Sequence, residues 1–484
     1  MSELRKRVTK VLIRYFPKLR TLDEHNKDMI YRTFNSLFMR LVRTGISFVF
    51  NVLLARLLGA EGAGVYALAY TITRISSLIG RIGLDNAVLR FTAANASQKD
   101  WNKVAGVYRH AMVVMTALSS AVAFVVFLAA PLFARLFNEP TLIEPMHWMA
   151  ISILPWSWSF MQGQLLQGLQ KIEDSIFVQT LGSSIIAIPF LLLLGSKFGV
   201  VGAAMSFVLG NAIVALLGLR LWKRYTPQIA DMKGEFDRDL LMRTSYPLFW
   251  TDFTMVFIGL ADTLLLGFFA DKSAVGIYDQ AKRVSVLGSA FLAATSFVAV
   301  PKYAALFADG QIEKMGRLAR NTARLATLLS LPYLVLFVIF PGWVMSIFGP
   351  EFAQGGTVLA ILSISRLIDS VTGDVGYLLI MSGNEKVMRN VTLWTNLLKI
   401  GFYFVLIPPF GYVGAAVGTM LGDSARNIIL FLEVYSRLRI ITLPLPGNMI
   451  ERLRKILPTP MPAPVSPVLD PVAATATAVP GESV

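Results

Sequence analysis

The sequence predicts an all-α polytopic membrane protein with about twelve transmembrane helices, arranged as two parallel six-helix lobes around a central cavity. Three observations predict this class: an apolar composition, an unequal distribution of Lys and Arg between alternate loops, and an internal repeat. Of the 484 residues, 55% are apolar and only 15% are charged, whereas an ordinary soluble domain has about a quarter of its residues charged. The mean hydropathy of +0.60 indicates the same class.

Apolar stretches along the chain supply the predicted spans. The run AMVVMTALSSAVAFVVFLAAPLF from Ala111 alone supplies the roughly 20 residues that a helix needs to cross hydrocarbon. The predicted spans are 34–58, 64–84, 106–130, 146–166, 174–195, 200–221, 244–269, 275–298, 321–341, 354–380, 390–408 and 411–435.

The positions of Lys and Arg orient these spans. With a cytoplasmic N-terminus, the cytoplasmic segments hold roughly 32 of the 45 Lys and Arg, and the opposite loops hold only Arg135, Lys197 and Lys272. A missed or invented span would move every later loop to the other side of the membrane and remove this asymmetry. The asymmetry therefore supports twelve spans. We therefore expect a multi-pass protein of the cytoplasmic (inner) membrane with both termini in the cytoplasm. The net charge of +15 comes mainly from loops that face anionic headgroups, and it requires no nucleic acid.

The two ends of the chain differ from the spans. Residues 1–33 form a basic cytoplasmic N-terminus whose apolar residues share one helical face, which is typical of a helix on an anionic leaflet; a disordered basic tail is the alternative. No signal-peptide pattern is present there. Residues 436–484 are predicted to be a cytoplasmic tail, largely disordered, because their Pro- and Ala-rich sequence lacks bulky periodicity.

The internal repeat is clearest in two stretches about 212 residues apart. KFGVVGAAMSFVLGNA begins at Lys197 and PFGYVGAAVGTMLGDS begins at Pro409. Four further pairs of windows keep the same order and nearly the same offset; in one of them Val65-Tyr66 falls on Ile277-Tyr278. Five windows with a common offset indicate a duplication.

The duplication sets the domain organisation. Six spans per half is an even number, so both halves begin in the cytoplasm and the repeats are parallel, with a cleft expected between them. We predict an N-lobe over residues 34–222, a polar interlobe linker over 223–243 and a C-lobe over 244–435. This is a transporter architecture.

The second copy carries charges that the first lacks. Asn211 and Val214 of the first copy become Asp423 and Arg426, whose i,i+3 spacing predicts a structural ion pair. The same spacing predicts a pair between Arg366 and Asp369 in span ten.

Basic residues inside the spans are the main functional signal. Each lipid-exposed Arg or Lys at mid-membrane would cost about 2.5–3.5 kcal/mol, so these residues must reach an interface, pair or line a wet cavity. The ten are Arg40, Arg43, Arg56, Arg74, Arg81, Lys282, Arg283, Arg366, Lys399 and Arg426.

The first two helices of each lobe hold most of the charge that a cavity between the lobes would use. The predicted substrate-binding residues are Arg40, Arg43, Arg74, Arg81, Lys282 and Arg283, and Asp252 and Asp262 are either ion-coupling residues or charge partners. A cationic surplus suits phosphate or pyrophosphate, which Arg grips with bidentate hydrogen bonds. The alternative is that the arginines are structural, paired with the aspartates or placed in the headgroup zone.

Three stretches resemble a known family. LGAEGAGVY at Leu58–Tyr66, IGLDNAVLRF at Ile82–Phe91 and the FGxVGAA opening of each lobe's last span are similar to polysaccharide flippases, over about residues 30–440. These are the O-antigen and lipid-linked oligosaccharide exporters of the multidrug/oligosaccharidyl-lipid/polysaccharide exporter superfamily. The resemblance implies a multidrug-and-toxin-extruder-like fold and movement of polyprenyl-(pyro)phosphate-linked sugar repeat units across the membrane by alternating access. It also implies functional arginines in the cavity, for which Arg40, Arg43, Arg74 and Arg81 are the nearest matches.

Two other functions compete with a flippase. A multidrug or cation antiporter on the same fold would use a buried acid in the first lobe, where the spans offer arginines instead. A membrane polymerase or glycosyltransferase acting on lipid-linked sugars would need acid–base residues in sizeable outer loops, and the longest offers only Glu139 and Glu144. We therefore expect no enzyme.

The expected partners are a lipid-linked oligosaccharide and membrane lipids, with coupling to H⁺ or Na⁺ left open and the protein a monomer. The chain has no Cys and only three widely spaced His, so no metal and no cofactor are expected.

Overall fold

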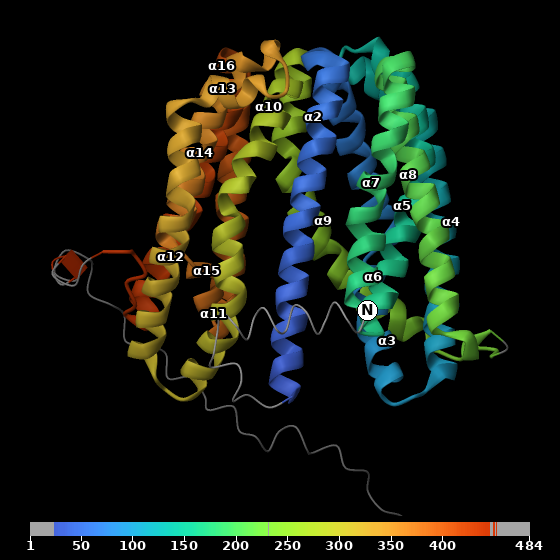
Figure 1. Cartoon of the computed structure of the whole chain (residues 1–484), viewed down its shortest axis with the longest axis horizontal. Helices are drawn as coiled ribbons and strands as arrows, with labels where there is room; N and C mark the ends of the chain where they lie inside the picture. The colour runs from blue at the N-terminus through green and yellow to red at the C-terminus, as the bar shows by residue number, and fades with distance from the viewer. Residues whose placement is uncertain (1–23, 231, 446–448, 451, 453–484) are drawn as a thin grey trace, which may run out of the picture. The chain divides into compact units, whose positions relative to one another are not determined.

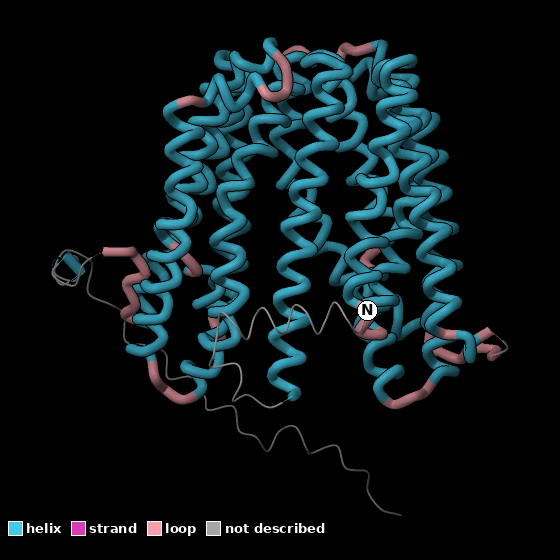
Figure 2. The backbone as a smooth tube through the Cα atoms, viewed as in Figure 1, coloured by secondary structure: helices cyan, strands magenta, loops and turns pink. Residues whose placement is uncertain are grey.

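The computed structural model describes residues 24–230, 232–445, 449–450 and 452, with side chains from residue 42 onward. The predicted basic N-terminal helix, up to residue 23, and the C-terminal tail beyond residue 452 lie outside the described residues. The described chain is helical, its helices are joined by short loops, and it contains no strand (Figure 2).

The longer helices follow the predicted spans. They are α2 (Glu24–Arg81), α3 (Leu84–Ser97), α4 (Trp101–Leu136), α5 (Ile143–Gly168), α7 (Gly182–Phe190), α8 (Ser196–Tyr225), α9 (Arg238–Phe269), α10 (Lys272–Val286), α11 (Ala290–Ala308), α12 (Ile312–Ile339), α14 (Gly356–Thr372) and α16 (Glu385–Leu438). Shorter elements between them are η2 (Pro140–Leu142), α6 (Ile172–Ile176), η3 (Phe177–Leu181), η4 (Leu191–Gly195), η5 (Pro227–Ile229), η6 (Leu287–Ser289), α13 (Pro341–Ser346), η7 (Pro350–Gly355) and α15 (Val375–Met381).

Eight helical stretches of the described chain are long and apolar enough to cross a membrane. Three of them, Val42–Arg81, Ile172–Tyr225 and Glu385–Leu438, are too long for one crossing, since 40 residues of straight helix measure about 60 Å and hydrocarbon is about 30 Å thick. Each contains a glycine with non-helical φ and ψ where two predicted spans meet. Counting these as two, and adding α5 over 146–166, recovers the twelve predicted spans. The all-α polytopic membrane fold is confirmed.

Two of those glycines are repeat-related. Gly199 has φ 55° and ψ −129°, and Gly411 has φ 55° and ψ −133°. A residue with a side chain is disfavoured at this positive φ, which explains why both copies of the repeat place glycine there. Equal backbone turns about 212 residues apart support the duplication.

The chain divides into two compact units, and the division cuts across α12, α14 and α16. Unit 1 comprises residues 1–290, 332–366 and 396–423, and unit 2 comprises residues 291–331, 367–395 and 424–484. Within unit 1, α2 packs against α10, α5 and α9 (Figure 1). The boundary after residue 290 follows η6, where the predicted span 275–298 is interrupted between α10 and α11.

The core of unit 1 contains residues from both repeats. Val65 and Tyr66 are buried together with their repeat counterparts Ile277 and Tyr278. Unit 2 has a core of its own around Tyr303, Leu378 and Val434.

Two glycines form a close contact between the repeats. A Cβ on Gly64 would lie 1.7 Å from the carbonyl oxygen of Lys272, and a Cβ on Gly276 would lie 2.1 Å from that of Ala60. Small residues allow helix backbones to approach closely in membranes, so α2 and α10 pack backbone to backbone here.

One predicted ion pair is wrong. Asp423 pairs with Lys399 at 3.1 Å and with Arg366 at 3.3 Å, and Arg426 lies 3.7 Å from Asp369, so Asp423 and Arg426 have other partners than each other. Spacing along one helix showed which residues share a face, but the partners of Asp423 come from the first half of α16 and from α14.

Candidate functional site

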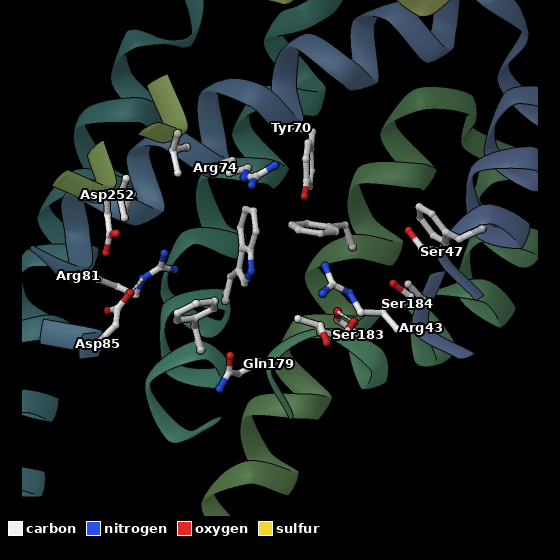
Figure 3. A pocket seen from close by; sticks show the side chains of 18 of the residues that line it. Arg43, Ser47, Tyr70, Arg74, Arg81, Asp85, Gln179, Ser183, Ser184 and Asp252 are labelled. Carbon is white, nitrogen blue, oxygen red and sulfur yellow. Dashed lines mark hydrogen bonds and ion pairs between the residues drawn. The ribbon is translucent and has the colours of Figure 1, made fainter. Parts of the chain in front are cut away.

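A pocket of about 580 Å³ lies within unit 1. Its walls come from both halves of α2 and from α3, α5, η3, α7, α8, α9 and α10 (Figure 3). Both repeats therefore contribute to it, through α2 of the first and through α9 and α10 of the second.

Four of the predicted cations line this pocket: Arg43, Arg74, Arg81 and Arg283. Arg74 is exposed to the pocket and forms no ion pair or hydrogen bond with the side chains that the structure describes. An Arg at mid-span without a partner is costly unless the pocket holds water or an anion. Its five donors are available to a ligand. Arg40 lies in α2, and its side chain is outside the described residues.

Two of the arginines already form ion pairs with carboxylates of the protein. The buried Arg81 lies 2.9 Å from Asp85 through Nε, donates to the Ser77 hydroxyl and sits 4.3 Å from the centre of the Phe160 ring. Arg283 pairs with Asp279 at 2.6 Å and lies over the Tyr70 ring. The ion pairs fix these two guanidinium groups at the pocket wall.

Lys282 and Asp262 lie elsewhere, against each other. The Lys282 ammonium is 2.5 Å from the Asp262 carboxylate, and Asp262 also accepts a hydrogen bond of 2.8 Å from the Tyr278 hydroxyl. Asp262 is only 2% exposed, and neither residue lines the pocket. The two charges neutralise one another inside unit 1.

Asp252 does line the pocket. Its carboxylate accepts a 2.8 Å hydrogen bond from the Asn86 amide, and it forms no ion pair with the residues that the structure describes. Asp85, the other carboxylate of the pocket, forms an ion pair with Arg81.

The pocket also contains uncharged residues that the sequence did not reveal. Tyr70, Trp156 and Phe207 form one aromatic cluster with ring-centre distances of 5.2–5.7 Å. Polar side chains of α5, η3 and α7 complete the wall: Gln164, Gln179, Thr180, Ser183 and Ser184. The only signal for them was the presence of Gln and Ser in otherwise apolar spans.

A clamp joins the repeats at one end of unit 1. Lys272, at the start of α10, pairs with Glu61 at 3.1 Å and also with Glu139. Nearby, Arg56 donates a 2.8 Å hydrogen bond to the carbonyl of Ile347. Burial acts to raise the pKa of Glu139, but hydrogen bonds from Lys272 and Thr141 outweigh it and lower the pKa below its usual range. We call Lys272, Glu61 and Glu139 the Lys272 clamp.

The described residues contain no group of three or more His, Cys, Asp or Glu that could hold a metal ion. The chemistry available in the pocket is therefore that of guanidinium groups, one unpaired carboxylate, amides, hydroxyls and aromatic rings.

Comparison with known proteins gives the family. Residues 32–307, more than half of the chain, match the family model described as polysaccharide biosynthesis protein. The chain belongs to this family. This is the family that the sequence motifs predicted, and its model covers every residue that lines the pocket.

Curated relatives of this family member match over shorter stretches. The probable flippase AglR of Haloferax volcanii is 29% identical over 268 residues, covering 53% of this chain and 48% of the relative. The capsular polysaccharide biosynthesis protein CapF of Staphylococcus aureus is 26% identical over 168 residues, covering 34% and 42%. The chain spans about half or less of the length of these two relatives.

Solved structures match the fold over nearly the whole chain. A multidrug resistance MATE family transporter of the MOP superfamily, in an inward-facing conformation, aligns with a TM-score of 0.67 at 16% identity, covering 87% of this chain and 99% of that one. The lipid II flippase MurJ, in an inward closed conformation, has a TM-score of 0.67 at 13% identity, covering 83% and 87%. At these identities the likeness shows the fold.

Proposed function

We propose that this protein is a flippase that moves polyprenyl-(pyro)phosphate-linked oligosaccharides across the cytoplasmic membrane by alternating access. The observation that carries the proposal is Arg74: an unpaired guanidinium in a pocket built from both repeats of a multi-pass membrane protein. Membership of the family of polysaccharide biosynthesis proteins and a relative named as a probable flippase support a flippase that acts in polysaccharide biosynthesis.

Electrostatics explains why the cargo would be an anion. An unpaired guanidinium in a membrane interior gains most from a charge-assisted, bidentate contact, which a phosphate group provides. Arg43 lies in the same pocket and can share the charge of a phosphate or pyrophosphate. The polyprenyl tail would remain in lipid.

Alternating access needs two bodies that move relative to each other. In the proposal these are the predicted lobes, residues 34–222 and 244–435, with the N- and C-termini in the cytoplasm. Parallel repeats commonly place the substrate site between them near the membrane midplane. The coupling ion, H⁺ or Na⁺, is left open, and the proposed protein acts as a monomer and not as an enzyme.

The first prediction concerns Arg74→Ala. Loss of a bidentate charge-assisted contact, worth about 1.5–3 kcal/mol, should slow transport roughly tenfold to a hundredfold. The measurement is the appearance of a polyprenyl-phosphate-linked glycan in the outer leaflet of proteoliposomes, detected by a glycan-cleaving enzyme added outside. The matched control is Arg135→Ala, because Arg135 is exposed and lies away from the pocket.

Two results would contradict the proposal. One is an Arg74→Ala variant that inserts normally and transports the glycolipid at the rate of the unmodified chain. The other is efflux of a lipophilic cation such as ethidium by a chain that moves no glycolipid, which would support the antiporter alternative.

A further inference from the structure

The pocket has two chemically different ends. Figure 3 shows Asp252, Arg81 and Asp85 at one side of the pocket, with Arg43, Ser183 and Ser184 at the opposite side. We call these the Asp252 end and the Arg43 end. The aromatic cluster of Tyr70, Trp156 and Phe207 also lines the pocket, and Tyr70 and Arg74 appear between the two ends.

The charges within the Asp252 end do not cancel completely. Arg81 is held by Asp85 at 2.9 Å, so these two residues form a closed pair. Asp252 receives one hydrogen bond, from the Asn86 amide. An ionised carboxylate offers about four acceptor positions, so Asp252 can accept further donors from a ligand in the pocket.

This carboxylate constrains how an anionic cargo can lie. A phosphate beside Asp252 would meet a like charge, which costs several kcal/mol in a poorly solvated site. The phosphate therefore belongs near Arg43 and Arg74, and the part of the head group that reaches Asp252 must carry hydrogen-bond donors. On a glycolipid these donors are the hydroxyl or amine groups of a sugar.

The aromatic cluster supports the same orientation. Aromatic rings provide rigid apolar surface with little loss of conformational entropy, and the C–H face of a sugar ring can pack on it. Asn86, Gln164 and Gln179 line the pocket too and can satisfy the remaining polar groups of a sugar.

We propose that Asp252 is a sugar-recognition residue that admits a neutral or amino sugar and rejects an acidic sugar at this end of the pocket. The inference rests on the proposed flippase function and adds the class of sugar to it. A carboxylate accepts from neighbouring hydroxyls or from an ammonium group, and it repels the carboxylate of a uronic acid.

The test is a binding experiment with the full chain in lipid nanodiscs and three probes: polyprenyl phosphate, polyprenyl-phosphate-glucose and polyprenyl-phosphate-glucuronate. The unmodified chain should bind the glucose probe at least tenfold more tightly than the glucuronate probe. Asp252→Asn should weaken binding of the glucose probe roughly tenfold and tighten binding of the glucuronate probe. It should leave the affinity for bare polyprenyl phosphate within about twofold of that of the unmodified chain.

Two further variants make the outcome specific. Asp239→Asn, an exposed carboxylate at the start of the same helix α9, should change none of the three affinities. Arg74→Ala should weaken all three probes together, because all three carry the phosphate.

The proposal is overturned if Asp252→Asn changes no affinity, or if it weakens bare polyprenyl phosphate as much as the glucose probe, which would show a structural role through Asn86. It is also overturned if the unmodified chain binds the glucuronate probe as tightly as the glucose probe. Failure of the flippase function looks different, because then the unmodified chain binds none of the three probes. Normal binding of bare polyprenyl phosphate by Asp252→Asn shows that this variant is folded.

Discussion

At the scale of single residues, the arginines of the pocket divide into bound and unbound charges. Arg81 has its charge compensated by Asp85 and is almost completely buried, whereas Arg74 is exposed to the pocket. A buried ion pair contributes little net stability over an apolar pair, but removing one partner strands the other charge. The two arginines therefore respond differently to substitution.

The prediction for this pair concerns Asp85→Asn. It should lower the stability of the protein by about 3–5 kcal/mol, because Arg81 keeps a buried charge without its counterion. The measurement is the Tm of the purified protein in detergent. The double variant Arg81→Met with Asp85→Leu should lose less stability than Asp85→Asn alone. An equal or larger loss of stability would show that the ion pair itself stabilises the fold.

Sequence position predicted the charged part of the pocket but not all of it. Lys282 and Arg283 were both expected there, yet adjacent residues of an α-helix point about 100° apart. Arg283 faces the pocket and Lys282 faces Asp262. The aromatic and amide residues gave no comparable signal, since an uncharged side chain in an apolar span can face lipid, protein or cavity at similar cost. Whether the lining arginines contact substrate stays a prediction.

At the scale of helices, the contact of α2 with α10 depends on two glycines. The 1.7 Å and 2.1 Å separations calculated for a Cβ at Gly64 and Gly276 leave no room for a methyl group facing the partner's backbone. The contact can accept a side chain only if the two helices move apart, which opens a gap in the core around Tyr66 and Tyr278.

We therefore expect Gly64→Ala to destabilise the protein by at least about 1–3 kcal/mol through overpacking. Gly45→Ala in the same helix is the matched control, because a Cβ there meets nothing within 4 Å, and it should raise helix propensity instead. Thermal unfolding of both variants in one detergent measures the difference. Equal Tm values for the two would contradict backbone-to-backbone packing at Gly64.

Helix positions were the part of the fold that the sequence predicted best. Apolar runs, loop charges and the repeat together predicted the spans. The thickness of the hydrocarbon determines the length of a span, and the Lys and Arg of the loops beside it indicate which side is cytoplasmic. The η6 interruption between α10 and α11 was not predicted, although its Gly288-Ser289 pair is of a kind at which helices kink. The Tyr333 hydroxyl donates a hydrogen bond to the carbonyl of Gly288 at this break.

At the scale of the whole molecule, the proposed alternating access requires contacts between repeats that can break. The Lys272 clamp is such a contact, because Lys272 belongs to the second repeat and Glu61 and Glu139 belong to the first. Glu61 is exposed, so its contact with Lys272 costs little to break. Glu139 is buried, so opening the clamp requires water to reach its carboxylate.

The last prediction uses the absence of cysteine from the sequence, which makes a single introduced thiol a specific reporter. Ala60→Cys places it beside the Gly64–Gly276 contact, where Ala60 is 1% exposed. In this background Lys272→Ala should speed labelling by a polar maleimide several-fold, because the closed state loses its ion pairs. Ser196→Cys, at an exposed position, should label equally fast with and without Lys272.

Acid should also speed the labelling of Ala60→Cys. The pKa of Glu139 is lowered in the folded protein, so its contribution to stability is present above the ordinary carboxyl pKa and is lost as the pH falls through the folded pKa. The prediction is wrong if neither Lys272→Ala nor acid changes the labelling rate of Ala60→Cys, because the Lys272 clamp then does not hold this end closed.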